Sequence, residues 1–343
     1  MATSAASTPD RARVRLTGIS SRAYEHPADR GALVALRKLN GFDIVLRKIS
    51  GLFSERRLRL LFLGSAVKAG DTQFKDLHHY VRDAAYVLDL PEVPELYVVQ
   101  DPQPALMAVG SDRPFVVMTS GMFDLLDPAE RRFAIGHEVG HILSGHATYR
   151  TLLLGLTRLA ARVAWVPLGY LGLRAIVTAL EEWYRKSELS CDRAGLLASQ
   201  DPDAAKRALM KLAGGSRLAE MNPDAFREQA HQYETDGDAR DGVLKLLSLM
   251  GRTHPFAVVR FAELDRWMTA GHYQRILDGD YPRRADDQTT SIGDDVREAA
   301  RSYQEAWNRS ADPFFGLARD VVGGATQAGR GLIGNVFNRA RSS

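Results

Sequence analysis

Residues 137–141 read His137-Glu138-Val139-Gly140-His141, the pattern H-E-x-x-H. Residues four apart share one face of a helix, so both imidazoles can bind one metal ion while Glu138 lies beside a metal-bound water. Two histidines and an acid at this spacing are typical of zinc peptidases. The alternative is a buried helix with two core histidines, in which the carboxylate would need other partners.

The residues around this pattern predict that it lies on a helix. Asp127 suits the N-cap, Pro128 the first helical position and Glu130 the first turn. The following run is too long for an ordinary strand. Gly145 is a suitable C-terminal stop, and we expect His146 to end the helix, one position out of register with the metal-facing side.

A catalytic zinc usually takes three protein ligands and leaves one position for water. The segment 185–195 contains E-x-x-x-D, which places Glu188 and Asp192 on one helical face. Glu188 can be the third ligand, and Asp192 can accept the second ring N–H of a ligating histidine. The alternative is a charged helix surface with short-range ion pairs, such as Glu182 with Lys186 or Arg185 with Glu188. If Glu188→Ala left the zinc content unchanged, the third ligand would be sought at Glu181 or Glu182.

Four separated motifs resemble the HtpX-like and CAAX-prenyl-protease family of zinc metallopeptidases, in the family's order. The resemblance extends over approximately residues 60–265, and its motifs are 116–126, the zinc helix through Ser144-Gly145-His146, the segment 188–195, and Thr253-His254-Pro255 with Arg260. H-E-x-x-H alone would indicate only a zinc peptidase. The later E-x-x-x-D and H-P-x-x-x-x-R elements make the resemblance specific.

The resemblance implies the roles of the central residues. His137, His141 and Glu188 correspond to the ligands of one Zn²⁺ per chain, and Glu138 corresponds to the general base. Such a base takes a proton from the zinc-activated water and later passes it to the leaving amine. The expected activity is therefore that of a zinc-dependent metalloendopeptidase that hydrolyses peptide bonds.

The resemblance also implies three supporting residues. Asp192 corresponds to an acid that orients a ligand, His254 to a histidine near the metal, and Arg260 to the arginine that follows it. We expect His254 to stabilise the oxyanion, or to occupy the open zinc position at rest. The chain departs from the family at 104–108, where an Asn-Ala-Phe-Ala-like segment is common, and at Cys191, where Ala is common.

The expected substrate is a polypeptide that is unfolded or membrane-associated, which would fit membrane-associated protein quality control. The alternative function is that of a catalytically latent, metal-stabilised protein with a chaperone-like or binding role. Glu138 favours the enzyme, because a purely structural metal site does not need a base beside the water.

The predicted fold class is α+β and mainly helical, with a gluzincin-type zinc peptidase core. Three short β-rich runs, 96–99, 105–109 and 115–118, precede the zinc helix and are separated by turn residues. They predict a small antiparallel sheet beside that helix. An edge strand near the metal could bind substrate as an added strand, although a plain scaffold sheet is equally compatible with the sequence.

The composition limits the class of protein. The chain has 343 residues with 45 Lys+Arg against 42 Asp+Glu, a balance that gives no reason to expect nucleic acid as a partner. Its single cysteine excludes an internal disulfide. The first residues lack the apolar core of a secretory signal, so we expect a cytoplasmic protein, peripheral at the inner face of the membrane.

The predicted organisation has four parts. They are a partly disordered N-terminal segment 1–29, a metallopeptidase domain 30–277, a polar linker and helix 278–310, and a basic, amphipathic, Gly-rich tail 311–343.

Two apolar regions within the domain could meet a membrane surface. Residues 151–180 predict a hydrophobic helical hairpin, but Arg158, Arg162 and Arg174 interrupt it and argue against a true span. We expect the hairpin to lie on the membrane surface or to cover an apolar groove, with a buried core hairpin as the alternative. Residues 30–69 alternate basic and apolar groups, which fits either a cover over the core or a membrane-facing helix.

Overall fold

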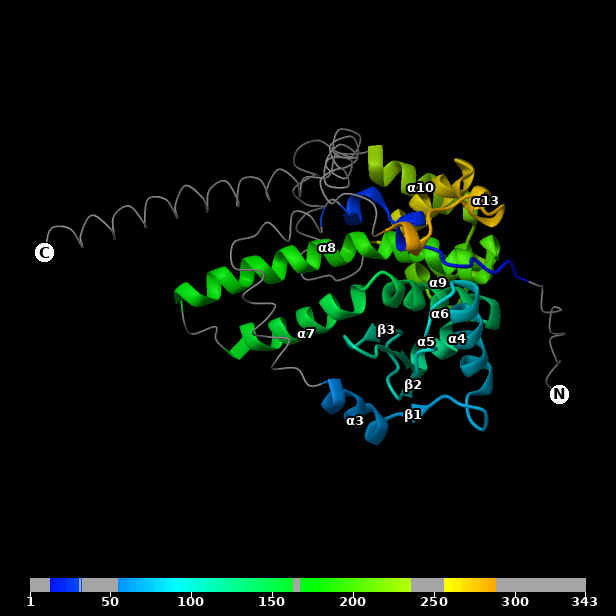
Figure 1. Cartoon of the computed structure of the whole chain (residues 1–343). Helices are drawn as coiled ribbons and strands as arrows, with labels where there is room; N and C mark the ends of the chain where they lie inside the picture. The colour runs from blue at the N-terminus through cyan, green and yellow to red at the C-terminus, as the bar shows by residue number, and fades with distance from the viewer. Residues whose placement is uncertain (1–12, 31, 33–54, 163–166, 236–255, 288–343) are drawn as a thin grey trace, which may run out of the picture.

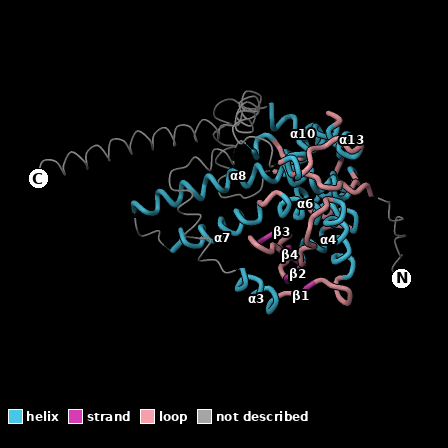
Figure 2. Tube along the Cα trace, viewed as in Figure 1, coloured by secondary structure: helices cyan, strands magenta, loops and turns pink. Residues whose placement is uncertain are grey.

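The computed structural model describes residues 13–30, 32, 55–162, 167–235 and 256–287 (Figure 1). The described part is mainly helical with one small sheet, as Figure 2 shows. In chain order its elements are η1 (Ser21–Ala23), α3 (Glu55–Ser65), β1 (Val67–Lys68), α4 (Lys75–Val87), β2 (Leu96–Val99), β3 (Leu106–Val109), β4 (Phe115–Thr119), α5 (Ser120–Leu125), α6 (Pro128–Leu143), α7 (His146–Arg162), α8 (Pro167–Ser199), α9 (Pro202–Gly214), η2 (Leu218–Glu220), α10 (Pro223–Thr235), α12 (Ala257–Thr269), α13 (His272–Leu277) and η3 (Arg284–Asp286).

The sheet is mixed, with the strand order β1-β2-β4-β3. β4 runs parallel to β2 and antiparallel to β3. The prediction of an antiparallel sheet is therefore wrong, whereas its place beside the H-E-x-x-H helix α6 is confirmed by the contacts between α6 and β3. The reason lies in β4. Its five residues are all buried, and a continuous apolar run of this kind suits a central strand covered on both faces.

Helices cover both faces of the sheet (Figure 1). On one face, Tyr97 and Phe115 pack against Leu58 and Phe62 of α3. On the other face, alternate strand residues such as Val116 join the core formed with α4 and α6. This alternation follows from the two-residue period of a strand, and it fixes the edge strand β3 next to α6.

The central packing contact joins α6 and α8, and small residues make it close. A Cβ atom on Gly140 would lie 2.4 Å from Cβ of Ala194, and one on Gly136 would lie 2.5 Å from Cβ of Ala198. On the facing helix, a Cβ on Gly195 would lie 2.7 Å from the carbonyl oxygen of Phe133. The two helices thus meet along a seam of small residues, and at positions 136, 140 and 195 only glycine fits.

The described segments 13–30 and 281–287 also join the core. Leu16 and Ile19 are fully buried. Ile19 forms an isolated β-bridge with Arg283, and the backbone N–H of Ser20 donates to the carbonyl of Pro282 at 3.0 Å. The sequence alone did not predict this contact between 13–30 and 281–287. The division of the chain at residues 29, 277 and 310 stays a prediction, and the tail 311–343 lies outside the described residues.

The helices α7 and α8 run side by side away from the sheet (Figures 1 and 2). Side chains of the two helices are buried against one another close to the rest of the core. The buried cluster consists of Leu152, Leu153, Leu156, Val177, Leu180, Trp183 and Tyr184, together with Ala32. This part of the hairpin is therefore covered by protein. Within the described segments, no helix combines the length and the apolar character needed to cross a membrane.

The seam between α6 and α8 yields a stability prediction. Gly140→Ala should lower the free energy of unfolding, because overpacking costs about 1–3 kcal/mol while the gain in helix propensity is about 1 kcal/mol. Thermal unfolding should show a reduced Tm. The compensating pair Gly140→Ala with Ala194→Gly should recover most of the loss.

Gly64→Ala on α3 is the control, because a Cβ there meets nothing within 4 Å. It should not destabilise the protein. A Gly140→Ala variant as stable as Gly64→Ala would show that the seam tolerates a wider helix spacing.

Candidate metal centre

Local sequence chemistry places the H-E-x-x-H residues on α6 as predicted. The Asp127 side chain accepts from the N–H of Glu130, and the Glu130 side chain accepts from the N–H of Asp127, which together form a capping box with Pro128 in the first turn. Gly145, with a φ of 73°, follows the helix as expected. His146 does not end the helix, however. It begins α7 and is buried, which corrects the prediction.

The helix α8 brings the E-x-x-x-D residues to the same place. Glu188 and Asp192 lie one turn apart and are both 1% exposed, although they come from a charged segment. The short-range pairing considered as an alternative occurs instead at Glu182, which contacts Arg185 and Lys186. Although α6 and α8 are far apart in the sequence, their close packing at Gly136, Gly140 and Gly195 brings the two motifs together.

Three predicted ligands converge on one point. Nε2 of His137 and Nε2 of His141 are 3.1 Å apart. Oε2 of Glu188 lies 3.4 Å from the first nitrogen, and Oε1 lies 3.2 Å from the second. Zinc–nitrogen bonds of about 2.0–2.1 Å place tetrahedral donors roughly 3.3 Å apart, so the separations and the N,N,O donor set fit a zinc ion.

Asp192 and Arg260 orient the first of these histidines. Oδ1 of Asp192 lies 3.0 Å from Nδ1 of His137, and Arg260 donates to both carboxylate oxygens of Asp192 at 2.6 and 2.8 Å. Burial opposes ionisation of Asp192, but Arg260 and His137 outweigh it and lower its pKa. An ionised Asp192 accepts the Nδ1–H, which leaves Nε2 of His137 free to bind a metal.

The carboxylates around His137 favour a positive charge at this position. Burial alone would lower the pKa of this ring, but Glu188 and Asp192 raise it to about 9. In contrast, burial lowers the pKa of His141 well below its ordinary value and keeps the ring neutral. The centre therefore combines an available lone pair on His141 with an excess of negative charge next to His137, as a divalent cation requires.

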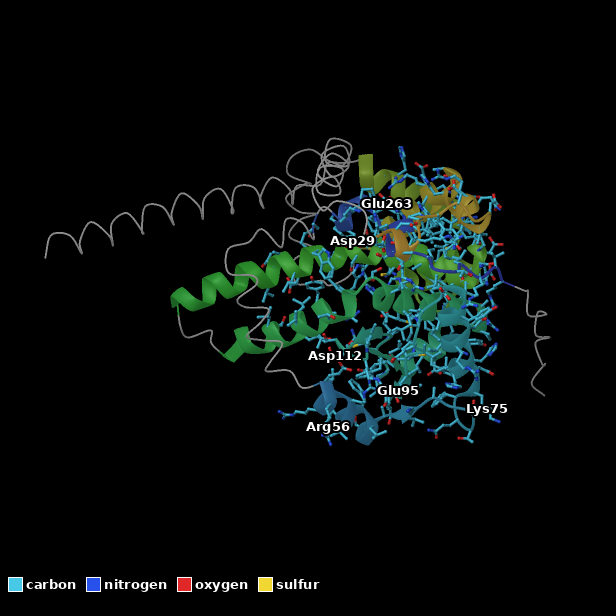
Figure 3. All side chains as sticks on the ribbon, in the orientation of Figure 1. Asp29, Arg56, Lys75, Glu95, Asp112 and Glu263 are labelled. Carbon is cyan, nitrogen blue, oxygen red and sulfur yellow. The ribbon has the colours of Figure 1, made fainter. Side chains whose placement is uncertain are left out.

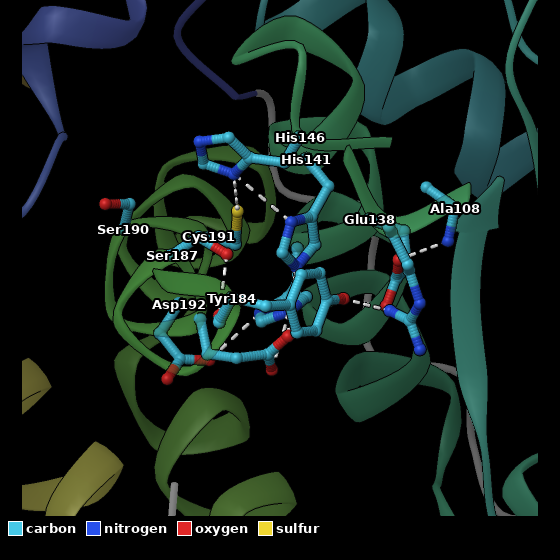
Figure 4. A network of polar contacts seen from close by, with 12 residues as sticks. Ala108, Glu138, His141, His146, Tyr184, Ser187, Ser190, Cys191 and Asp192 are labelled. Carbon is cyan, nitrogen blue, oxygen red and sulfur yellow. Dashed lines mark hydrogen bonds and ion pairs between the residues drawn. The ribbon is translucent and has the colours of Figure 1, made fainter. Parts of the chain in front are cut away.

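Glu138 points from α6 toward the edge strand β3 (Figure 4). Its Oε2 accepts from the backbone N–H of Ala108 at 2.6 Å, and the side chain is buried. Burial raises the pKa of Glu138 above its ordinary value. A carboxylate with a raised pKa beside a metal position is suited to accept a proton from water.

Sequence reasoning did not identify Tyr184 and Arg150 as part of the centre. The Tyr184 ring stacks on His141 with centroids 5.4 Å apart and an interplanar angle of 7°. The guanidinium of Arg150 lies 4.8 Å from the centroid of the same ring and donates to its hydroxyl. A usable signal was the position of Tyr184, four residues before Glu188 on the same helical face.

The structure describes one of the two remaining predicted site residues. Arg260 is buried against Asp192, and its Nη1 lies 3.4 Å from Oε2 of Glu188. His254 lies outside the described residues. A second group of potential ligands within the described residues consists of His141, His146 and Cys191, and it borders the first through His141.

Comparison with known proteins identifies the family of the chain. The chain matches the model of peptidase family M48 over residues 71–268, a stretch that contains every residue of the centre named above. It is 33% identical over 259 residues to the plastoglobule-localized metallopeptidase 48, chloroplastic, of Arabidopsis thaliana, covering 74% of each chain.

Bacterial relatives extend the comparison. The chain is 27% identical over 229 residues to a protease HtpX homolog of Tropheryma whipplei, covering 59% of this chain and 76% of the relative. It is also 27% identical over 229 residues to one from Streptococcus gordonii, covering 57% and 74%. No solved structure matches the chain.

The carboxylate behind His137 yields a prediction about metal affinity. Asp192→Asn should weaken zinc binding by about 10–100-fold, because an amide cannot accept from His137 and from both Arg260 nitrogens at once. Competition with a chromophoric chelator measures the change. Asp224→Asn, at a side chain that is 86% exposed on α10, is the control and should leave the affinity unchanged. Equal affinities in the two variants would remove Asp192 from the centre.

Proposed function

Because the chain belongs to peptidase family M48, a family of metalloproteases, we propose that it is a zinc-dependent endopeptidase with Glu138 as the general base. The observation that carries the proposal is the convergence of His137, His141 and Glu188 to within 3.4 Å of one another, with the Glu138 carboxylate on the next face of the same helix. The ligand roles and the single zinc per chain are part of the proposal.

The chain's own groups account for the proton movements. A zinc ion held by the three ligands would activate a water molecule and polarise the scissile carbonyl. Glu138 removes a proton from the attacking water as the new C–O bond forms, and returns it to the amine nitrogen as the C–N bond breaks. His254 stays our proposal for a second donor to the oxyanion.

The edge of β3 favours an extended polypeptide as substrate. The Ala108 N–H points away from β4 toward Glu138, and backbone groups two residues apart in a strand face the same side. Among the described strands β3 is the last of the sheet, so Leu106 and Ala108 present their backbone groups at its outer edge beside the base. A substrate added there as a strand must have an accessible backbone, which favours unfolded polypeptides.

A latent, metal-stabilised binding protein is the second candidate function. The observation in its favour is the burial of Glu138, which is 3% exposed and bonded to Ala108. In such a protein the metal would stabilise the fold, and the base would not meet a substrate.

Cleavage of unfolded casein distinguishes the two. Wild-type protein should cleave it, and a chelator should stop the reaction. Glu138→Gln should retain zinc and the fold but lose cleavage by at least about 100-fold, as expected for removal of a general base. Glu188→Ala should instead lower the zinc content.

Retained cleavage by metal-loaded Glu138→Gln would refute the general-base role. Zinc without chelator-sensitive cleavage in the wild type would favour the latent protein.

We also propose that the protein works at an anionic lipid surface, which it contacts through α3. Leu58 and Phe62 of this helix pack on the sheet, whereas Leu60, Leu61 and Leu63 are each more than half exposed. Arg56 and Arg57 precede these leucines and are exposed on the same helix; Figure 3 labels Arg56. Leucines flanked by arginines suit the boundary between lipid headgroups and acyl chains, and one relative is named for its plastoglobule location.

Liposome flotation tests the lipid contact. The intact chain should float with vesicles that contain anionic lipid and less well with neutral ones. The triple change Leu60→Ser, Leu61→Ser, Leu63→Ser should reduce the partition coefficient into the vesicles by more than about tenfold, because each buried CH₂ contributes about 0.8 kcal/mol. A matched triple change to serine at exposed Val14, Val93 and Leu212, which lie on other segments, should have a smaller effect. Unchanged flotation of the triple variant would exclude α3 as the contact.

A further inference from the structure

The second nitrogen of the ligand His141 faces another histidine. Nδ1 of His141 lies 3.3 Å from Nδ1 of His146, and Nε2 of His146 lies 3.5 Å from Oδ2 of Asp29 (Figure 4 shows the two histidines). All three side chains are buried. We propose that His146 is a positioning residue that orients His141 for the metal, with Asp29 fixing the orientation and tautomer of His146. This inference rests on the proposed function.

The positions of the ring protons on His141 and His146 support this series of contacts, which runs from His141 through His146 to Asp29. When Nε2 of His141 binds a metal, its Nδ1 carries the ring proton and must donate it. Nδ1 of His146 then has to be the acceptor. Its own proton consequently lies on Nε2, where it faces the carboxylate of Asp29. The contact between the two Nδ1 atoms therefore pairs one donor with one acceptor only when His146 is neutral with its proton on Nε2, where Asp29 at 3.5 Å attracts it electrostatically.

Neighbouring groups hold this arrangement in place. Asp29 accepts from the hydroxyl of Ser190 on α8 at 2.6 Å. The ring of His146 meets Trp183 edge-on, with centroids 5.2 Å apart and an interplanar angle of 87°. His146 itself begins α7, immediately after the turn at Gly145. The ring is thus fixed from three elements, as a positioning residue requires.

Cys191 also approaches His146, with Sγ 3.5 Å from Nδ1. This nitrogen has one lone pair, and the metal-bound form of His141 uses it. Burial raises the pKa of the Cys191 thiol well above its ordinary value, so the sulfur stays protonated. We therefore assign Cys191 to packing beside the two rings, and not to a second metal site.

The two ligand histidines would consequently be oriented by different chemistry. His137 faces the ionised carboxylate of Asp192, which Arg260 holds. His141 faces the neutral imidazole of His146, and Asp29 influences His141 only through that ring. A carboxylate acceptor makes a ligand ring more basic than a neutral acceptor does, so the residues predict two zinc–nitrogen bonds of unequal donor strength.

The test compares His146→Leu with His146→Asn. Leucine has a similar bulk but no acceptor, whereas the asparagine Oδ1 lies close to the position of the histidine Nδ1. His146→Leu should bind zinc about 10–100-fold more weakly, and His146→Asn should recover most of the affinity. The d–d absorption spectrum of the Co²⁺-substituted protein should change in the Leu variant and return toward the wild type in the Asn variant. His79→Leu, an exposed position on α4, controls for the loss of a histidine.

Thermal unfolding of the metal-free proteins separates this effect from instability. Should His146→Leu not fold, His146→Asn is compared with His146→Ala, of which only Asn offers the acceptor. Equal zinc affinities and Co²⁺ spectra in either pair would overturn the proposal. Two metal ions per wild-type chain and one in a folded His146→Leu variant would also overturn it, because His146 would then be a ligand of a second ion.

The results that would refute the proposed function differ from those that would refute the role of His146. If the wild type binds zinc but does not cleave casein, the endopeptidase is refuted, while the comparison of zinc affinities still decides the role of His146. If the wild type binds no zinc, the metal centre itself is refuted.

Discussion

The close approach of α6 and α8 is the constraint on which the centre depends. Gly136 and Gly140 on one helix, with Gly195 on the other, leave no room for a Cβ atom between them. Because helices are stiff, this one contact sets the positions of His137, His141, Glu188 and Asp192 together. The separations of 3.1–3.4 Å among the proposed ligand atoms of His137, His141 and Glu188 follow from this contact, and the sheet and the other helices support the two helices in this position.

Burial makes the charges of this region interdependent. His137 and His141 are surrounded by three carboxylates, Glu138, Glu188 and Asp192, and two guanidiniums, Arg150 and Arg260. When all are ionised, one negative charge remains in a region of low dielectric constant, where an uncompensated charge is costly. A proton on His137 compensates it in the metal-free protein, and a divalent cation that displaced this proton would change the net charge of the same groups from −1 to +1. The same balance explains why Arg260 is deeply buried although arginine is usually exposed.

Local patterns in the sequence predicted the parts of the centre that lie on single helices. The capping box at Asp127 and Glu130 and the four-residue spacings of both motifs depend only on helix geometry, and the structure has the helices that they require. The three strands also lie within one residue of the predicted ranges. The order of the strands could not be deduced in this way, because it depends on which strand is covered on both faces.

Contacts between distant segments account for what the sequence did not show. His146 lies one position out of register with the metal-facing side of α6, which predicts a helix end, yet it begins a new helix that turns it back toward His141. Asp29 reaches it from 117 positions earlier in the chain, which no spacing rule captures. Arg150 and Tyr184 meet only because α7 and α8 pack together. The residue type of each gives no indication of a role in the centre, and the role follows only from contacts with segments far away in the sequence.

The pairing of residues 17–20 with 281–287 has a consequence for how the chain tolerates insertions. The hydroxyl of Ser20 lies 2.9 Å from the carboxylate of Asp287, 267 positions later in the chain. A contact of this kind closes a long loop, and the entropy cost of closing a loop grows only slowly with its length. Residues added to a surface loop between the two segments would therefore weaken this contact little, while the spacing between α6 and α8 stays the same.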